Sequence, residues 1–320
     1  MKRYLITGGT GYIGSMLVER LLNQENTEVA VIVREPGRLS NKIRDNVKII
    51  CADITDRETI LQIEGDYDYL IHCAAPTRSS YMVSHPVETA ETIVDGTRNM
   101  LELSVRCHIS SMVYLSSMEV YGNIDCSDGR KVSEKELGEL DISNVRSCYP
   151  MAKRMAENFC HLYYHEYGVP VKIARLAQTF GRGIHPDDNR VFAQFVRAVQ
   201  AGVDIVLHTH GTSMGNYCDI DDAVDAVLFL LDKGEAAQAY NIVNENNTMT
   251  IREMAELVAE KIAKGEIKVT YDIPDDNRFG YAAPTGLKLS GAKMKALGWE
   301  AETGLEEMYR RSIGLSVRKK

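Results

Sequence analysis

Short apolar runs alternate with longer amphipathic segments along the first half of the chain. The runs predict strands at Arg3–Thr7, Glu28–Arg34, Val47–Cys51, Tyr69–Cys73, Ser111–Ser116 and Val171–Leu176. The longer segments predict helices at Gly11–Leu22, Pro86–Cys107 and Tyr149–Tyr167. Apolar strands that alternate with helices are typical of a parallel sheet covered on both faces. The pattern therefore predicts an α/β fold built on a doubly wound parallel sheet.

The pattern changes after Gln178, where the periodic segments become shorter. It predicts a glycine-rich loop, a helix, a strand and a polar loop, at Gly181–Asn189, Val191–Ala201, Ile205–His208 and His210–Asn216. The segment DIDDAVDAVLFLL predicts a further helix of the large domain, and Ile251–Lys264 another helix. We expect residues 1–177, continued by about 212–243, to form the large domain. Residues 178–211 and 244–320 would then form a smaller, discontinuous C-terminal lobe.

Composition excludes several classes of protein. The 320 residues carry a formal charge of -8 with scattered Lys and Arg, which argues against a nucleic-acid surface. No targeting signal and no membrane segment are expected, because no apolar run is long enough. The seven cysteines form no C-x-x-C pair and suggest reduced thiols in a cytoplasmic protein. We expect no metal site: His161 and His165 have the i, i+4 spacing that could chelate an ion, but they form no ligand set with nearby acidic residues, and a surface or subunit contact is the expected role.

The clearest motif is GGTGYIG, with Gly8, Gly11 and Gly14 between the first strand and the first helix. Glycine permits a tight turn and lets the backbone approach a pyrophosphate at the helix N-terminus. The sequence therefore predicts a dinucleotide site of the Rossmann type, with Tyr12 and Ile13 beside the phosphates. A plain turn is the alternative.

Residues after the next three strands complete the expected cofactor site. Arg34 ends the second strand, where an acidic residue would bind the ribose of NAD. It suits the 2′-phosphate of NADP, and the alternatives are stacking on adenine or an ordinary solvated arginine, so NAD and NADP both remain open. Asp53 is expected at the adenine amine or as a helix cap. The remaining candidates are Ile54, Ala74 and Ala75.

Tyr149 and Lys153 form a second constellation, with Ser117 upstream at a strand end. A tyrosine has a pKa of about 10 and is a poor base at neutral pH. A lysine one helical turn away lowers that pKa with its charge, and a serine hydroxyl can hold a substrate oxygen. These three side chains are therefore the candidate catalytic residues.

These motifs resemble the extended short-chain dehydrogenase/reductases, the nucleotide-sugar epimerase and dehydratase family. Within it, VRSCYPMAKRMAEN and ARLAQTFGRGIHPDDNRVFAQF are most similar to the UDP-glucuronate decarboxylases. The resemblance implies a tightly bound NAD or NADP, and a nucleotide-diphosphate sugar that is oxidised at C4. It also implies a homodimer that pairs the helices Pro86–Cys107 and Tyr149–Tyr167.

The resemblance also assigns residues near the sugar. Glu119 falls where decarboxylases and 4,6-dehydratases have a glutamate acting near C5, but Met118 replaces the dehydratases' aspartic acid. Gly215 stands where many members have an anion-binding arginine, for which Arg182, Arg190 or Arg278 could substitute. Gln178 and His208 match substrate-contacting positions or are merely structural.

Three functions are compatible with these residues. The first is an NAD(P)-dependent nucleotide-sugar epimerase or dehydratase that works through a 4-keto sugar, with possible dehydration or decarboxylation at C5. The second is an NADPH-dependent carbonyl reductase, which Arg34 favours. The third is a non-catalytic dinucleotide-binding regulator.

Overall fold

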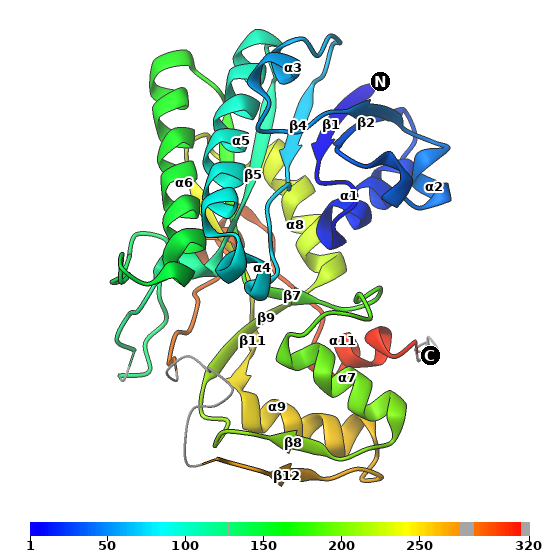
Figure 1. Ribbon diagram of the computed structural model, residues 1–320, viewed down its shortest axis with the longest axis vertical. Coiled ribbons are helices and arrows are strands. Elements are labelled where there is room, and N and C mark those ends of the chain that lie inside the picture. The colour runs from blue at the N-terminus through cyan, green and yellow to red at the C-terminus, as the bar shows by residue number, and fades with distance from the viewer. Residues whose placement is uncertain (127, 275–284, 315–320) are drawn as a thin grey trace. The chain divides into compact units, whose positions relative to one another are not determined.

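The computed structural model describes residues 1–126, 128–274 and 285–314. Its main feature is a seven-stranded sheet in the order β10-β6-β5-β4-β1-β2-β3 (Figure 1). The strands are β1 (Lys2–Thr7), β2 (Thr27–Val33), β3 (Lys48–Cys51), β4 (Tyr69–His72), β5 (Ser111–Ser117), β6 (Val171–Leu176) and β10 (Ala239–Ile242). The pairings from β3 across to β6 are all parallel. The strand order reverses between β1 and β4, which confirms the doubly wound fold.

Three long helices accompany the strands that the sequence predicted. They are α1 (Tyr12–Leu22), α5 (Pro86–Arg106) and α6 (Cys148–Tyr167), each within one residue of its predicted bounds. Shorter helical segments are η1 (Pro36–Arg38), α2 (Asn41–Arg44), α3 (Arg57–Leu61), α4 (Ser79–Ser84), η2 (Met118–Tyr121) and η3 (Val145–Ser147). The predicted helix in DIDDAVDAVLFLL is also present, as α8 (Ile220–Lys233).

Helices α5 and α6 lie side by side along the sheet (Figure 1). Their buried faces, with Met100 and Leu103 from α5 and Ala156 and Cys160 from α6, belong to one apolar core with the strands. Helix α6 also carries Tyr149 and Lys153, two of the candidate catalytic residues. Packing against the sheet therefore fixes the position of those side chains.

A second, smaller apolar core is formed around two small sheets. One has the order β11-β9-β7, formed by β7 (Gln178–Phe180), β9 (Met214–Asp219) and β11 (Asn244–Thr250); the other pairs β8 (Ile205–Leu207) with β12 (Val269–Tyr271). Stacked rings of Phe180 and Phe192, 4.4 Å apart, lie at its centre. The helices are α7 (Val191–Ala201), α9 (Ile251–Leu257), α10 (Ala292–Leu297) and α11 (Leu305–Ser312).

Two details of this part differ from the sequence prediction. The predicted polar loop His210–Asn216 is wrong at its end, because β9 begins at Met214 and the Asn216 side chain is buried, donating to the Leu287 carbonyl. The predicted helix Ile251–Lys264 is helical to Ile262, but its last turn, Val258–Ile262, is a π-helix.

The chain divides into two compact units. The first comprises residues 1–122, 137–176 and 224–240, and the second comprises 123–136, 177–223 and 241–320. The sequence pattern assigns residues 212–223 to the large domain, but they lie in the second unit because β9 pairs with β7 and β11. Among the described residues, no helix combines the length and apolar character needed to cross a membrane.

Candidate active site

The glycine turn between β1 and α1 is packed too tightly for any larger residue. Gly8 has a φ of +73°, and a Cβ added there would lie 2.9 Å from the amide nitrogen of Ala74. A Cβ on Gly14 would lie 2.2 Å from the Gly8 carbonyl oxygen. The Gly11 amide donates to that same carbonyl at 2.9 Å, which closes the turn. Its shape therefore depends on the glycines that the motif supplies.

Helix α1 presents an open N-terminus directly after this turn. Its N-cap is Gly11, no side chain caps it, and its first turn carries no acidic residue. Tyr12 and Ile13 begin the helix and are half-buried. Backbone amides at such an end attract an anion, because they carry partial positive charge and lack intrahelical partners. The geometry fits the pyrophosphate of a dinucleotide.

A network of buried, hydrogen-bonded polar side chains lies next to the glycine turn. Thr7 Oγ1 accepts from the amides of Cys73 and Ala74, both at 3.1 Å, and lies 2.7 Å from His72 Nδ1. Since this oxygen already accepts twice, it donates to Nδ1, and His72 Nε2 then donates to Thr97 Oγ1 at 3.2 Å. Burial lowers the pKa of His72 to about 3, and the charge of Lys153 adds to the effect, so the ring is neutral. The sequence prediction missed Thr7 and Thr97.

The predicted adenine end is more exposed. Arg34 Nη1 lies 3.6 Å from Asp53 Oδ2, and both side chains are well exposed. Asp53 Oδ1 accepts from the amide and hydroxyl of Thr55, at 2.9 and 2.7 Å. Asp56, and not Asp53, caps α3, so the alternative assignment of Asp53 as a helix cap is wrong. The side chain of Ile54 is buried in the core.

Ser117, Tyr149 and Lys153 come from β5 and α6 in the same unit. Ser117 ends β5 and caps η2, where its Oγ accepts from the Glu119 amide at 3.2 Å. Tyr149 is the second residue of α6, and Lys153 Nζ lies 5.8 Å from its ring centre. Lys153 also donates to the Leu115 carbonyl at 2.7 Å. Burial lowers the pKa of Lys153 to about 8, although the charge of Glu157 opposes this shift.

Glu119 is not isolated beside these residues, because it forms an ion pair with Arg146. Arg146 Nη2 lies 2.9 Å from Oε2 of Glu119 and 3.0 Å from Oε1. Its Nε donates to Ser79 Oγ at 3.1 Å, and the guanidinium lies 5.5 Å from the Tyr149 ring centre. The sequence prediction missed Arg146 and Ser79. The available signal was the position of Arg146, three residues before Tyr149 and just ahead of α6.

A buried ion pair connects α6 to the sheet. Glu157 accepts from Arg175 Nη2 at 2.7 Å and from Ser116 Oγ at 2.6 Å. The Arg175 and Glu157 side chains are only 6% and 7% exposed. Arg175 also donates to the Tyr121 hydroxyl at 3.1 Å. This network joins α6, which carries Tyr149, to β5, which carries Ser117. The sequence prediction missed these residues as well.

The candidates for sugar binding lie in the second unit. Gln178 Oε1 is buried and has no hydrogen-bond partner among the described residues. Arg190 pairs with Asp188 at 2.6 Å, and His208 Nδ1 lies 2.9 Å from the Asp272 carbonyl. Arg278 lies outside the described residues.

The space at Gly215 is filled by an aromatic side chain. A Cβ at this position would lie 2.3 Å from the hydroxyl oxygen of Tyr217, which is fully buried. An arginine could not replace Gly215 unless Tyr217 moved. Arg182 forms a two-pronged pair with Asp221, at 2.9 and 3.0 Å.

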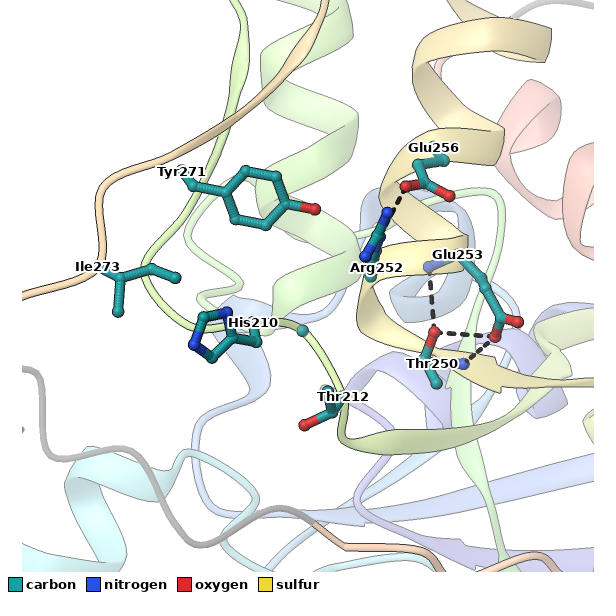
Figure 2. A pocket seen from close by; sticks show the side chains of 9 residues that line it. His210, Thr212, Thr250, Arg252, Glu253, Glu256, Tyr271 and Ile273 are labelled. Carbon is teal, nitrogen blue, oxygen red and sulfur yellow. Dashed lines mark hydrogen bonds and ion pairs between the residues drawn. The ribbon is translucent and has the colours of Figure 1, made fainter.

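The second unit also contains an open pocket of about 750 Å³ (Figure 2). Thr250 and Glu253 form a capping box at the start of α9, and Arg252 pairs with Glu256 at 2.8 Å. His210 and Tyr271 line the other side. None of the predicted site residues lies among the residues that line it.

Within residues 1–126, 128–274 and 285–314, no group of three or more His, Cys, Asp or Glu side chains could hold a metal ion. His161 and His165 are exposed on α6.

The glycine turn, the open helix N-terminus and the Ser117, Tyr149 and Lys153 side chains define a class, the dinucleotide-dependent α/β enzymes. A family model then identifies the chain more closely. The chain belongs to the NAD dependent epimerase/dehydratase family, whose model matches residues 4–244. This confirms the resemblance to extended short-chain dehydrogenases.

Individual proteins agree with this family. The chain is 33% identical to UDP-glucuronic acid decarboxylase 5 of Arabidopsis thaliana, over 95% of this chain and 86% of that protein. It is 26% identical to the dTDP-D-glucose 4,6-dehydratase of Bos taurus, over 98% and 88%. The solved UDP-glucose 4-epimerase of Thermotoga maritima has the same fold, with a TM-score of 0.83 over 98% of each chain at 24% identity.

Family membership settles two of the expectations. The protein is an enzyme of a nucleotide-sugar epimerase, dehydratase and decarboxylase family. The family is NAD dependent, and NAD is one of the two dinucleotides that the sequence left open. The open N-terminus of α1 and the glycine turn fit this cofactor.

Proposed function

We propose that the protein decarboxylates a nucleotide-diphosphate hexuronate through a transient 4-keto sugar. The observation that carries this proposal is Glu119, held by Arg146 beside Tyr149 and two residues after Ser117. A carboxylate next to the proton-transfer residue places acid–base chemistry one carbon from C4. The 33% identity to a UDP-glucuronic acid decarboxylase supports the same reaction.

Oxidation at C4 is the first step of the proposed reaction. NAD, when bound, supplies the oxidation by accepting a hydride and later returning it. Tyr149, as the phenolate, removes the proton of the C4 hydroxyl, and Ser117 orients that oxygen. Lys153 provides a buried positive charge one helical turn from Tyr149, which favours the phenolate.

The C4 ketone makes the sugar a β-keto acid. The C5–C6 bond breaks, its electron pair moves to the C4 oxygen as an enolate, and CO₂ leaves. A proton then adds at C5, the ketone is reduced, and a pentose remains on the nucleotide. We assign the C5 side to Glu119, because the Arg146 that it pairs with also lies 5.5 Å from the ring centre of Tyr149.

Met118 favours decarboxylation over dehydration. Elimination of a 6-hydroxyl needs an acid that protonates the leaving oxygen, and a thioether has no proton to give. Loss of CO₂ needs no such acid, because the leaving group departs as a neutral molecule.

Product analysis tests the proposal. We would incubate the purified protein with UDP-glucuronate, UDP-glucose or dTDP-glucose, without added reductant, and follow the products by mass spectrometry and proton NMR. We expect UDP-glucuronate to lose the mass of one CO₂ and yield a UDP-pentose. A 4-keto-6-deoxy product from either glucose, or an epimer of unchanged mass, would contradict decarboxylation.

We further propose that the protein is a homodimer that pairs α5 and α6 with a second copy. Helix α6 carries an exposed apolar stripe formed by Met151, Met155 and Leu162, at positions i, i+4 and i+11. These residues lie on one face of the helix, since this spacing corresponds to nearly whole turns. An apolar helix face of this kind is typical of an interface.

A further inference from the structure

The guanidinium of Arg146 is held at two of its three nitrogens. Nε donates to Ser79 Oγ, and Nη2 contacts both oxygens of Glu119. Nη1 is buried, and it has no hydrogen-bond partner among the described residues. A buried N–H of a cation without an acceptor is unfavourable, so the natural complement of this atom is an oxygen supplied from outside.

The position of Arg146 is fixed by the chain around it. Its amide donates to Asn144 Oδ1 at 2.9 Å, at the start of η3. The guanidinium lies 5.5 Å from the ring of Tyr149 and in contact with Glu119. A cationic side chain that is already fixed in place loses little side-chain entropy when it binds an anion.

We propose that Arg146 binds the C6 carboxylate of the sugar and makes the site selective for acidic sugars. This inference rests on the proposed function. C5 adjoins C4, so the carboxylate lies one ring carbon from the oxygen that Tyr149 and Ser117 handle. Nη1 of Arg146, which has no hydrogen-bond partner among the described residues, offers N–H donors to that carboxylate.

The charge balance supports this assignment. Glu119 alone would repel a second carboxylate, whereas Arg146 between the two compensates one of the negative charges. Lys153 is already bonded to the Leu115 carbonyl, and position 215 has no room for an arginine. A neutral hydroxymethyl group would gain a weaker hydrogen bond from the same nitrogen. Decarboxylation also removes the anion, so the product should bind less tightly than the substrate.

Binding measurements on the NAD-loaded protein test this proposal, because affinity can be measured while conversion of the ligand is blocked. UDP-glucuronate, UDP-glucose and UDP-xylose differ only in the substituent at C5. We would titrate each by calorimetry, with Tyr149→Phe as the background to prevent conversion, and add Arg146→Met or Arg146→Lys. Arg106→Met, at the exposed end of α5, is the matched control for losing one arginine.

We expect Arg146→Met to weaken UDP-glucuronate binding on the order of 10- to 100-fold and to leave UDP-glucose and UDP-xylose nearly unchanged. Arg146→Lys should bind UDP-glucuronate more tightly than Arg146→Met but less tightly than the wild type, because the positive charge remains while the planar guanidinium is lost. Ser79→Ala, which frees Nε alone, should have a smaller effect of the same kind. Thermal unfolding of each variant reports whether it is folded.

Two results would overturn the inference. Equal weakening of all three ligands would mean that Arg146 shapes the site without recognising a carboxylate, and unchanged UDP-glucuronate affinity would exclude any contact. If the wild-type protein decarboxylates UDP-glucuronate while either result holds, only this inference fails. If the wild-type protein neither binds nor converts UDP-glucuronate, the proposed function fails and the inference falls with it.

Discussion

At the scale of single residues, two cationic side chains, Lys153 and Arg146, lie near the ring of Tyr149, and they differ in burial. Lys153 is buried and lies 5.8 Å from the ring centre, while Arg146 is half-buried and lies at 5.5 Å. Lys153 contacts the backbone of β5, and Arg146 contacts Glu119. This division separates the residues that we propose for the C4 oxidation from those that we propose for the C5 step, so the two stages can be tested separately.

Glu119→Gln should block the second stage and preserve the first. The amide keeps the shape of the side chain but cannot exchange a proton, while Tyr149 and Ser117 still oxidise C4. We expect product formation to fall on the order of 10²- to 10⁴-fold, the usual effect of losing a general acid or base. Reduced cofactor should accumulate and appear as NADH absorbance on mixing with UDP-glucuronate. Tyr149→Phe is the control and should show neither NADH absorbance nor product. Full activity of Glu119→Gln would assign the C5 side to another group.

Lys153 predicts an alkaline limit of activity. Burial lowers its pKa to about 8, so the side chain is charged below that pH and loses its charge as the pH rises through it. The phenolate of Tyr149 loses a stabilising cation in the same interval. We therefore expect kcat/KM to fall above about pH 8.

Lys153→Arg checks the origin of this limit, because a guanidinium remains charged throughout the range. If the variant retains activity, its profile should stay flat where the wild-type profile falls. An unchanged alkaline limb in Lys153→Arg would assign the limit to a different group.

At the scale of elements, the Glu157–Arg175 pair joins α6 to β6 and, through Ser116, to β5. Glu157→Ala should destabilise the fold by about 3–5 kcal/mol, because Arg175 would remain buried without a counter-charge. Urea unfolding followed by circular dichroism measures the change. The matched control is Glu306→Ala in the exposed Glu306–Arg310 pair of α11, which should cost about 0.5 kcal/mol or less. Equal effects of the two variants would show that the buried pair has no special role.

At the scale of the whole molecule, the proposed homodimer depends on the apolar stripe of α6. Met155→Glu should place a charge in the interface and shift the protein to monomers in sedimentation at micromolar concentration. Val206→Glu is the control, since Val206 has a similar exposed fraction and lies on β8, in the second unit. A wild-type protein that sediments as a monomer would refute the dimer.

The sequence predicted most of the larger sheet and its helices because those elements depend on neighbours along the chain. An apolar run such as Val171–Leu176 forms a buried strand wherever the sheet lies, and the predicted bounds match β6. The glycine spacing and the i, i+4 spacing of Tyr149 and Lys153 are also local patterns. In the small sheets the predicted strand Ile205–His208 matches β8, but β7, β9, β11 and β12 were not predicted, since they are short or polar and pair with segments distant in sequence.

The sequence by itself determined the family, the parallel fold and the candidate trio Ser117, Tyr149 and Lys153, because periodicity and motif spacing carry that information. Only the tertiary structure decided the partners of the charged side chains. Arg146 meets Glu119 and Ser79 across 27 and 67 residues of chain, and Tyr217 rather than an arginine fills the space at Gly215. The physical reason is that a charged group takes its partner from whatever the packing of helices on strands brings within a few ångströms, and no local pattern encodes that proximity.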